Sequence, residues 1–217
     1  MIGNGQNIYI VDDEPEIRGL ISRLAQSLGH RAEALSDAET LLARLKPDAA
    51  GCIVLDLWLP GRNGMETQRE LNLRGFNLPV IFTSGYADVS IAVEAMKAGA
   101  YDFIEKPFSF QRMTEAICGA LLRDQQTREH RRAVQAIRAR AAELSKRELE
   151  VLHLVADGLG SSEIAARLGI QTKTIEVHRS HIIGKMNARN TADLVRMYHF
   201  IQGEIEVRTE ERRREIA

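Results

Sequence analysis

Short apolar runs alternate with amphipathic segments over the first 122 residues of the chain. Five runs rich in apolar and β-branched residues have the length of strands, and each is followed by a segment whose apolar positions recur every three to four residues. Strands that alternate with helices are typical of a parallel sheet with helices on both faces. The expected strands are 7–11, 31–35, 51–56, 78–83 and 101–105, and the expected helices are 14–28, 37–46, 63–74, 88–98 and 109–122.

The pattern changes after residue 143, where four helical segments follow one another without strands. They cover 145–157, 161–168, 172–186 and 191–199, and their joints are short turns that contain Gly158, Gly160 and Gly169. A short turn between two helices near the middle of such a set predicts a helix-turn-helix.

Residues 123–143 contain no Pro or Gly and are rich in Arg, Gln, Glu and Ala, which predicts a helical linker. Its sparse apolar positions, Val134 and Ile137 among them, leave two interpretations open. The helix pairs with its copy in a second chain, or it is a plain solvated helix. The tail from Gly203 is charged and lacks an apolar stripe, so we expect it to be frayed outside an oligomer.

These patterns together predict two domains with a linker and a tail. Residues 1–122 form a doubly wound α/β domain with a five-stranded parallel sheet of the flavodoxin-like type. Residues 123–143 form the helical linker, 144–202 an all-α four-helix helix-turn-helix domain, and 203–217 the charged tail.

Composition agrees with a soluble protein of two domains. The chain has 217 residues, of which 44% are hydrophobic and 27% charged, and no apolar run approaches the roughly 20 residues of a membrane helix. We expect no secretory leader and a cytoplasmic location, with Cys52 and Cys118 as buried reduced thiols. Residues 1–122 carry a net charge of −5 and residues 123–217 a net charge of +4, which indicates separate partners for the two halves.

Asp56 ends the most apolar of the predicted strands and is followed by a Pro-Gly loop. Reactive groups in open α/β sheets gather where strands end, so this carboxylate is a candidate for the chemistry. The alternative is a side chain that caps backbone donors before a turn. Two other strand ends favour the first interpretation, because one runs into Asp12 and Asp13 and another into Lys106.

Three carboxylates around one point repel one another unless a cation lies among them, and hard oxygen ligands suit Mg²⁺. Asp12 and Asp13 alone could instead cap a helix. A metal ion and the ammonium group of Lys106 can together neutralise a phosphoryl group on a carboxylate, and the carboxylate of Asp56 can act as the nucleophile that receives it. Ser84, before Gly85 at the end of the fourth strand, adds a hydroxyl donor.

These motifs resemble the receiver domain of bacterial two-component response regulators. The matching residues are Asp12-Asp13, the run from Asp56 to Gly64, Ser84-Gly85 and Lys106-Pro107-Phe108. The resemblance implies that Asp56 accepts phosphate from a histidine kinase, with Lys106 and Ser84 at the phosphoryl group, and that the Lys106–Pro107 bond is cis. It also implies Ser84 and Phe103 as switch residues and a Mg²⁺ site made by Asp12, Asp13, Asp56 and the backbone carbonyl of Trp58.

The second domain resembles the LuxR-type effector domain of the NarL/FixJ family. The resemblance rests on the runs 144–152, 163–165 and 174–178 and on Lys185-Met186. Ile175, Ile182 and Met186 are expected to face the core, so the rest of the same helix is available to DNA. The candidate DNA-binding residues are Thr172, Lys173, Thr174, Glu176, Val177, Arg179, Ser180, His181 and Lys185.

The combined pattern predicts a response regulator that controls transcription when Asp56 is phosphorylated. Its expected partners are a sensor histidine kinase and double-stranded promoter DNA, RNA polymerase could be a further one, and no membrane is involved. The phosphorylated form is expected to be a homodimer that pairs through the surface of the fourth helix and fifth strand, with Ala92, Val93, Met96 and Ile104.

Two other classes compete with this prediction. A phosphohydrolase would use Asp56 as a transient nucleophile, but that class needs a second acid two residues later, where this chain has Trp58. We therefore do not expect an enzyme. A regulator that binds only proteins would not need the predicted basic recognition helix, and salt-dependent DNA binding distinguishes it.

Overall fold

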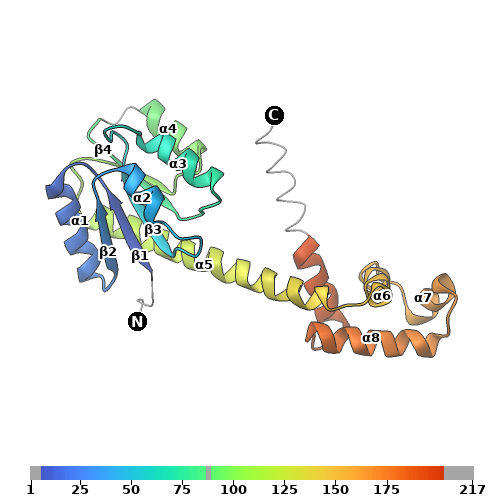
Figure 1. Cartoon of the computed structure of the whole chain (residues 1–217). Helices are drawn as coiled ribbons and strands as arrows, with labels where there is room; N and C mark the ends of the chain where they lie inside the picture. Colours follow the sequence, from blue (N-terminus) through green and yellow to red (C-terminus); the bar gives the residue numbers. More distant parts are fainter. Residues whose placement is uncertain (1–5, 87–88, 203–217) are drawn as a thin grey trace. The chain divides into compact units, whose positions relative to one another are not determined.

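The computed structural model describes residues 6–86 and 89–202, and Figure 1 shows the order of the elements along the chain. The predicted tail from Gly203 and the predicted helix start at Asp88 lie outside the described residues. The five strands are β1 (Asn7–Val11), β2 (Arg31–Leu35), β3 (Gly51–Asp56), β4 (Val80–Ser84) and β5 (Asp102–Glu105). The helices are α1 (Pro15–Ser27), α2 (Ala38–Arg44), α3 (Gly64–Leu73), α4 (Val89–Lys97), α5 (Phe110–Ala142), α6 (Lys146–Ala156), α7 (Ser161–Leu168) and α8 (Thr172–Met186), and residues 191–202 are also helical.

The five strands form one parallel sheet in the order β2-β1-β3-β4-β5. This is the doubly wound, flavodoxin-like fold that the alternation of strands and helices predicts. The order reverses beside β1, so the carboxyl ends of β1 and β3 form the topological switch point of the sheet. Ligands of such folds bind at this place.

The alternation of side chains along each strand divides the core of the sheet into two layers. Ile8, Ile10 and Val54 pack with α1 and α5 on one face. Tyr9 and Leu55 belong to the other layer, which contains buried residues from α2, α3 and α4. All six residues of β3 are buried, because this strand lies in the middle of the sheet and is covered on both faces.

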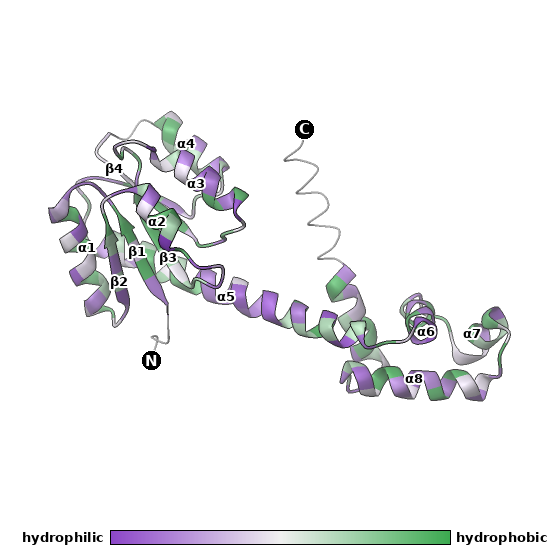
Figure 2. Cartoon of the chain, viewed as in Figure 1, coloured by the Kyte–Doolittle hydropathy of each residue, from purple (hydrophilic) through white to green (hydrophobic). Residues whose placement is uncertain are grey.

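Helix α5 runs without a break through the predicted closing helix and the predicted linker. No Pro interrupts this stretch, and contacts divide the described chain into two compact units after Arg128. Figure 2 shows the middle of α5 as mostly hydrophilic, with scattered hydrophobic positions. One of them, Val134, is buried, and Ile137 packs against the core of the second unit. These two apolar side chains are therefore covered by residues of the same chain.

Helices α6, α7 and α8 and the helical residues 191–202 share one hydrophobic core in the second unit. Leu152, Ile164, Ile175, Ile182 and Leu194 are almost completely buried in it. Ser145 and Glu148 form a capping box that fixes the start of α6. This core confirms the predicted all-α helix-turn-helix unit.

Candidate metal centre and nucleic-acid interface

Three carboxylates meet at the carboxyl ends of β1 and β3. One carboxylate oxygen from each of Asp12, Asp13 and Asp56 lies within 4.8 Å of the others. Asp12 and Asp56 are only 1% and 5% exposed, while Asp13 is exposed. The sequence predicts this cluster because the two strands are parallel neighbours that end at the same edge of the sheet.

The backbone around Asp56 is held in place by close packing at the start of α3. A Cβ atom on Gly64 would lie 2.6 Å from the carbonyl oxygen of Asp56, so only glycine fits at this contact. The Gly64 N–H donates to the carbonyl oxygen of Leu57, and the Trp58 N–H donates to Asp56 Oδ1 at 3.2 Å. The second carboxylate oxygen of Asp56 is then available to the site.

Lys106 crosses from the end of β5 to the carboxylates. Its Nζ lies 2.8 Å from Asp12 Oδ2, 2.9 Å from Asp56 Oδ2 and 3.0 Å from Glu14 Oε1. Burial alone would lower the pKa of Lys106, but its hydrogen bonds with Asp12, Asp56 and Glu14 raise the pKa above the usual lysine value. The ammonium group therefore stays charged. The Lys106–Pro107 peptide bond is cis, as the resemblance implies.

Asp12 is the carboxylate most affected by burial. Desolvation raises its pKa above the usual aspartate value, and the nearby charge of Asp56 acts in the same direction. Hydrogen bonds from Lys106 and from the Glu14 N–H oppose this rise. One ammonium group thus faces three clustered carboxylates and Glu14, so a divalent cation with oxygen ligands fits the remaining negative charge.

Ser84 and Phe103 occupy neighbouring strands beside the carboxylates. Ser84 is fully buried at the end of β4, and its hydroxyl donates to the carbonyl oxygen of Tyr86 at 2.8 Å. Phe103 is half-buried on β5 and packs against the layer that contains α2, α3 and α4. In this structure the Ser84 hydroxyl is therefore satisfied by the loop that follows it.

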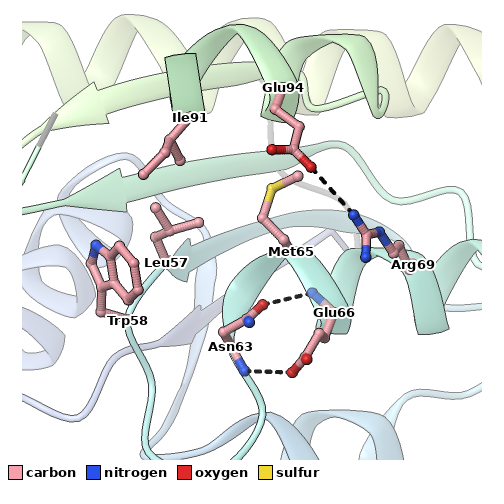
Figure 3. Close-up of a pocket in the computed structure, with 8 residues that line it drawn as sticks. All are labelled: Leu57, Trp58, Asn63, Met65, Glu66, Arg69, Ile91 and Glu94. Atoms are coloured by element: carbon pink, nitrogen blue, oxygen red, sulfur yellow. Dashed lines mark hydrogen bonds and ion pairs between the residues drawn. The ribbon is translucent and has the colours of Figure 1, made fainter. Parts of the chain in front are cut away.

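A pocket of about 250 Å³ adjoins the acidic site between α3 and α4. In Figure 3, Leu57, Trp58, Met65 and Ile91 contribute its apolar lining, and the Arg69–Glu94 ion pair spans the two helices. Trp58, the single tryptophan of the chain, is 55% exposed here. Its indole therefore lies outside the sheet core, while its backbone N–H is bonded to Asp56.

The candidate dimer surface is only partly where the sequence places it. Val93 and Met96 of α4 are 46% and 47% exposed, and Ala92 is partly exposed. The expectation for Ile104 is wrong, because this residue is 3% exposed and packs in the core with α1 and α5. Its side chain points to the face of β5 opposite Phe103, as alternation along a strand requires.

Helix α8 presents the predicted division between a buried and an exposed face. Ile175, Ile182 and Met186 are completely buried. Arg179 is partly buried and donates to Thr191 Oγ1 at 3.3 Å. The exposed candidates for DNA contact are Thr172, Lys173, Thr174, Glu176, Val177, Ser180, His181 and Lys185.

Lys185 differs from the other exposed residues of α8 because its ammonium group is already paired. Its Nζ lies 2.7 Å from Glu148 Oε2, and it also donates to the carbonyl oxygen of Glu143. Glu148 is 5% exposed. This contact revises the expectation for Lys185: we assign it to the packing of α8 against α6 and not to the DNA contacts.

The ion pair makes the stability of the second unit sensitive to acid. The hydrogen bond from Lys185, followed by the bonds to Ser145, lowers the pKa of Glu148 from 4.5 to about 2. A carboxylate whose pKa is lower in the folded protein stabilises the fold at pH values above its pKa in the unfolded chain. This stability is lost as the pH falls towards the pKa in the folded protein. We expect the hydrogen-exchange protection factors of α6 and α8 to fall between about pH 4.5 and 2.

The matched variant for this prediction is Glu148→Gln, which keeps the shape but not the titratable group. It should have lower protection factors than the wild-type chain at neutral pH and a smaller further decrease as the pH falls. Equal pH dependence of exchange in the two proteins would contradict the role of Glu148.

Sequence reasoning named most of the site but missed two of its contacts. Glu14 follows Asp12 and Asp13 in the same acidic run, yet its role as a third partner of Lys106 depends on geometry. Arg18 donates to the backbone carbonyl oxygen of Asp12 at 2.7 Å from one turn into α1. The acidic run was a signal for Glu14, whereas a solvent-facing arginine on a helix gives none.

Two family models match the chain. Residues 8–118 match the response regulator receiver domain, and residues 142–198 match the bacterial regulatory proteins of the luxR family. No helix among the described residues is long and apolar enough to span a membrane.

Relatives match over most of their length. Nodulation protein W of Bradyrhizobium diazoefficiens is 38% identical over 88% of this chain and 84% of its own. The transcriptional regulatory protein FixJ of Azorhizobium caulinodans is also 38% identical, over 88% of this chain and 90% of its own. The solved structure of the response regulator StyR covers 90% of this chain and 99% of its own, with a TM-score of 0.82 and 34% identity.

Proposed function

Because the chain belongs to the response regulators that join a receiver domain to a LuxR-type DNA-binding domain, we propose that Asp56 is the acceptor of its phosphoryl signal. The observation that carries this proposal is the convergence of Asp12, Asp13 and Asp56 with Lys106 at the switch point of the sheet. The donor is a sensor histidine kinase.

The reaction is the transfer of a phosphoryl group from a phosphorylated histidine to a carboxylate oxygen of Asp56. The N–P bond of the donor breaks and an O–P bond forms, so Asp56 acts as the nucleophile. Lys106 supplies a fixed positive charge next to this oxygen. Asp12, Asp13, Asp56 and the Trp58 carbonyl would hold Mg²⁺, which when bound neutralises charge on the transferring phosphoryl group.

The switch residues connect the acceptor with the α4 surface. The acyl phosphate on Asp56 would carry about −1.5 to −2 charges where the carboxylate carries −1, so phosphorylation adds up to about one negative charge beside Ser84. We propose that the Ser84 hydroxyl leaves the Tyr86 carbonyl to bind a phosphoryl oxygen, and that Phe103 moves with it. Phosphorylation would thereby bias an existing equilibrium of the α4 and β5 surface.

The second unit would bind DNA in response to phosphorylation. Two chains that pair through Val93 and Met96 would present two α8 helices about one DNA turn, roughly 34 Å, apart. Lys173 and His181 would contact phosphates, and Glu176, Val177 and Ser180 would meet base edges. RNA polymerase would be a further partner at the promoter, and the protein would act in the cytoplasm.

We retain residues 1–122, 123–143 and 144–202 as proposed functional boundaries, with 203–217 as the tail. The role of Asp56 would be that of a signalling acceptor and not of a phosphohydrolase nucleophile. Trp58 supports this assignment, because it occupies the position at which a phosphohydrolase needs its second acid.

Light scattering of the full chain tests the role of Asp56 and the pairing surface together. The molar mass is measured with Mg²⁺ before and after beryllofluoride is added as a mimic of the phosphoryl group. We expect the molar mass to double, and both Asp56→Ala and the double variant Val93→Glu, Met96→Glu to stay monomeric. Leu73→Glu is the control, because Leu73 is exposed on α3 and outside the pairing surface. Doubling in the Asp56→Ala variant would contradict the role of Asp56.

A further inference from the structure

A second cavity lies at the edge of the sheet opposite the acidic site. It has a volume of about 450 Å³ and adjoins the amino ends of β1 and β2 and the middle of α5. Its lining residues are Gln6, Leu28, His30, Cys118, Gly119, Leu121, Leu122 and Gln125. The volume is in the range of small-molecule sites in proteins, and no role in phosphoryl transfer accounts for it.

The lining is mostly apolar, with a few polar groups on one side. Leu28, just after the end of α1, and Leu121 and Leu122 of α5 supply aliphatic carbon. Gln6, His30 and Cys118 supply polar atoms, and Cys118 is exposed to solvent, so the expectation of a buried thiol is wrong for this residue. An apolar wall with a few convergent polar groups is the usual composition of a ligand pocket.

His30 is the unusual member of this lining. It is only 8% exposed, and its Nδ1 is completely buried without a hydrogen-bond partner among residues 6–86 and 89–202. Buried polar atoms in proteins are nearly always paired, because an unpaired one loses its bonds to water. Nε2 of the same ring is not among the buried unpaired atoms, so the imidazole edge that carries Nε2 is the one available to the cavity.

We propose that this cavity binds a small, mostly apolar molecule that carries one hydrogen-bond acceptor. The apolar body would pack against Leu28, Leu121 and Leu122, and the acceptor would receive the Nε2–H of His30. The volume admits a molecule of on the order of ten to twenty non-hydrogen atoms.

The wall of this cavity also belongs to the network that fixes α5 to the sheet. Gln6 Nε2 donates to the Leu121 carbonyl oxygen at 2.8 Å and to Asp124 Oδ2 at 3.1 Å. The same carboxylate oxygen of Asp124 accepts from the Gly51 N–H and from Arg128 Nε, each at 2.9 Å. A ligand bound beside Gln6 and Leu121 would therefore stabilise the contact between α5 and the amino ends of β1 and β3.

Cys118 makes occupancy of the cavity measurable in the full chain. It is exposed and lines the cavity, whereas Cys52 is buried in the core and burial raises the pKa of its thiol. Ellman's reagent should therefore label one thiol, and Cys118→Ser should remove that reaction. The probe ligand is 8-anilinonaphthalene-1-sulfonate, which has an apolar ring system and one anionic group and fluoresces in apolar sites.

The expected result is saturable binding of one probe molecule per chain and slower labelling of Cys118. At a probe concentration ten times the dissociation constant, labelling should slow about tenfold, since only the empty cavity exposes the thiol. Both measurements should give the same half-saturation concentration. Labelling that is independent of the probe would overturn the proposal.

Three variants separate this site from nonspecific binding. Cys118→Trp fills the cavity and should abolish the fluorescence increase, whereas Glu115→Trp, at an exposed position of α5 outside the lining, should not. His30→Phe should weaken the sulfonate probe several-fold and leave the affinity for naphthalene unchanged. Equal probe binding by the wild-type and Cys118→Trp chains, with equal thermal unfolding, would also overturn the proposal.

Discussion

Asp56→Asn is expected to reduce incorporation of a phosphoryl group by roughly a hundredfold or more. The amide keeps the shape of the side chain but cannot form an acyl phosphate, and it no longer balances the ammonium group 2.9 Å away on Lys106. The measurement is the intact mass of the full chain after incubation with acetyl phosphate and Mg²⁺. The wild-type chain should gain the mass of one phosphoryl group, and the variant should not.

A chemically identical change elsewhere in the same unit serves as the control. Asp37→Asn alters the N-cap of α2, where the side chain accepts from the Thr40 N–H at 2.8 Å. Asparagine caps helices about as well as aspartate, so this variant should accept phosphate like the wild-type chain. The Asp13→Asn variant should need a higher Mg²⁺ concentration for the same phosphoryl incorporation, because the change removes one proposed metal ligand. Full phosphorylation of Asp56→Asn would show that another residue is the acceptor.

Lys173→Ala is expected to weaken DNA binding about threefold to tenfold at physiological salt and to reduce the slope of log affinity against log salt by about 0.9. Lys173 is exposed in the first turn of α8, next to residues that we propose to meet base edges. Removing one phosphate contact removes one released counterion. The measurement is fluorescence anisotropy of labelled promoter DNA at several salt concentrations.

Lys185→Ala is the matched control, since it removes the same charge from the same helix. Its ammonium group is paired with Glu148, so the variant should lower the stability of the second unit and leave the salt slope unchanged. If both variants reduced the slope equally, Lys185 would contact DNA and our assignment of it to packing would be wrong. If neither did, α8 would not be the helix that contacts phosphates.

Local sequence was sufficient for the fold and for most of the acidic site. The strands around Ile10 and Leu55 are apolar runs of strand length, and parallel neighbours bring their last residues to one edge. Asp12, Asp13 and Asp56 therefore converge without any knowledge of distant contacts. Alternation along β5 also places Ile104 on the face opposite Phe103, so its burial follows from the local sequence as well.

Contacts between distant residues could not be predicted in the same way. Lys185 and Glu148 are brought together only when α8 packs against α6, and either residue alone has the pattern of a solvated helix. The same holds for Asp124, which fixes α5 to Gly51 on β3 although the local sequence indicates a solvated linker. Such pairs depend on tertiary packing, which hydrophobic periodicity does not specify.

The central claim is that the state of Asp56 controls DNA binding by the second unit. The most direct test is the affinity of the full chain for its promoter DNA with Mg²⁺, with and without beryllofluoride. We predict that the mimic raises the affinity of the wild-type chain and leaves the affinity of Asp56→Asn unchanged. An identical affinity of the wild-type chain in both conditions would contradict the claim.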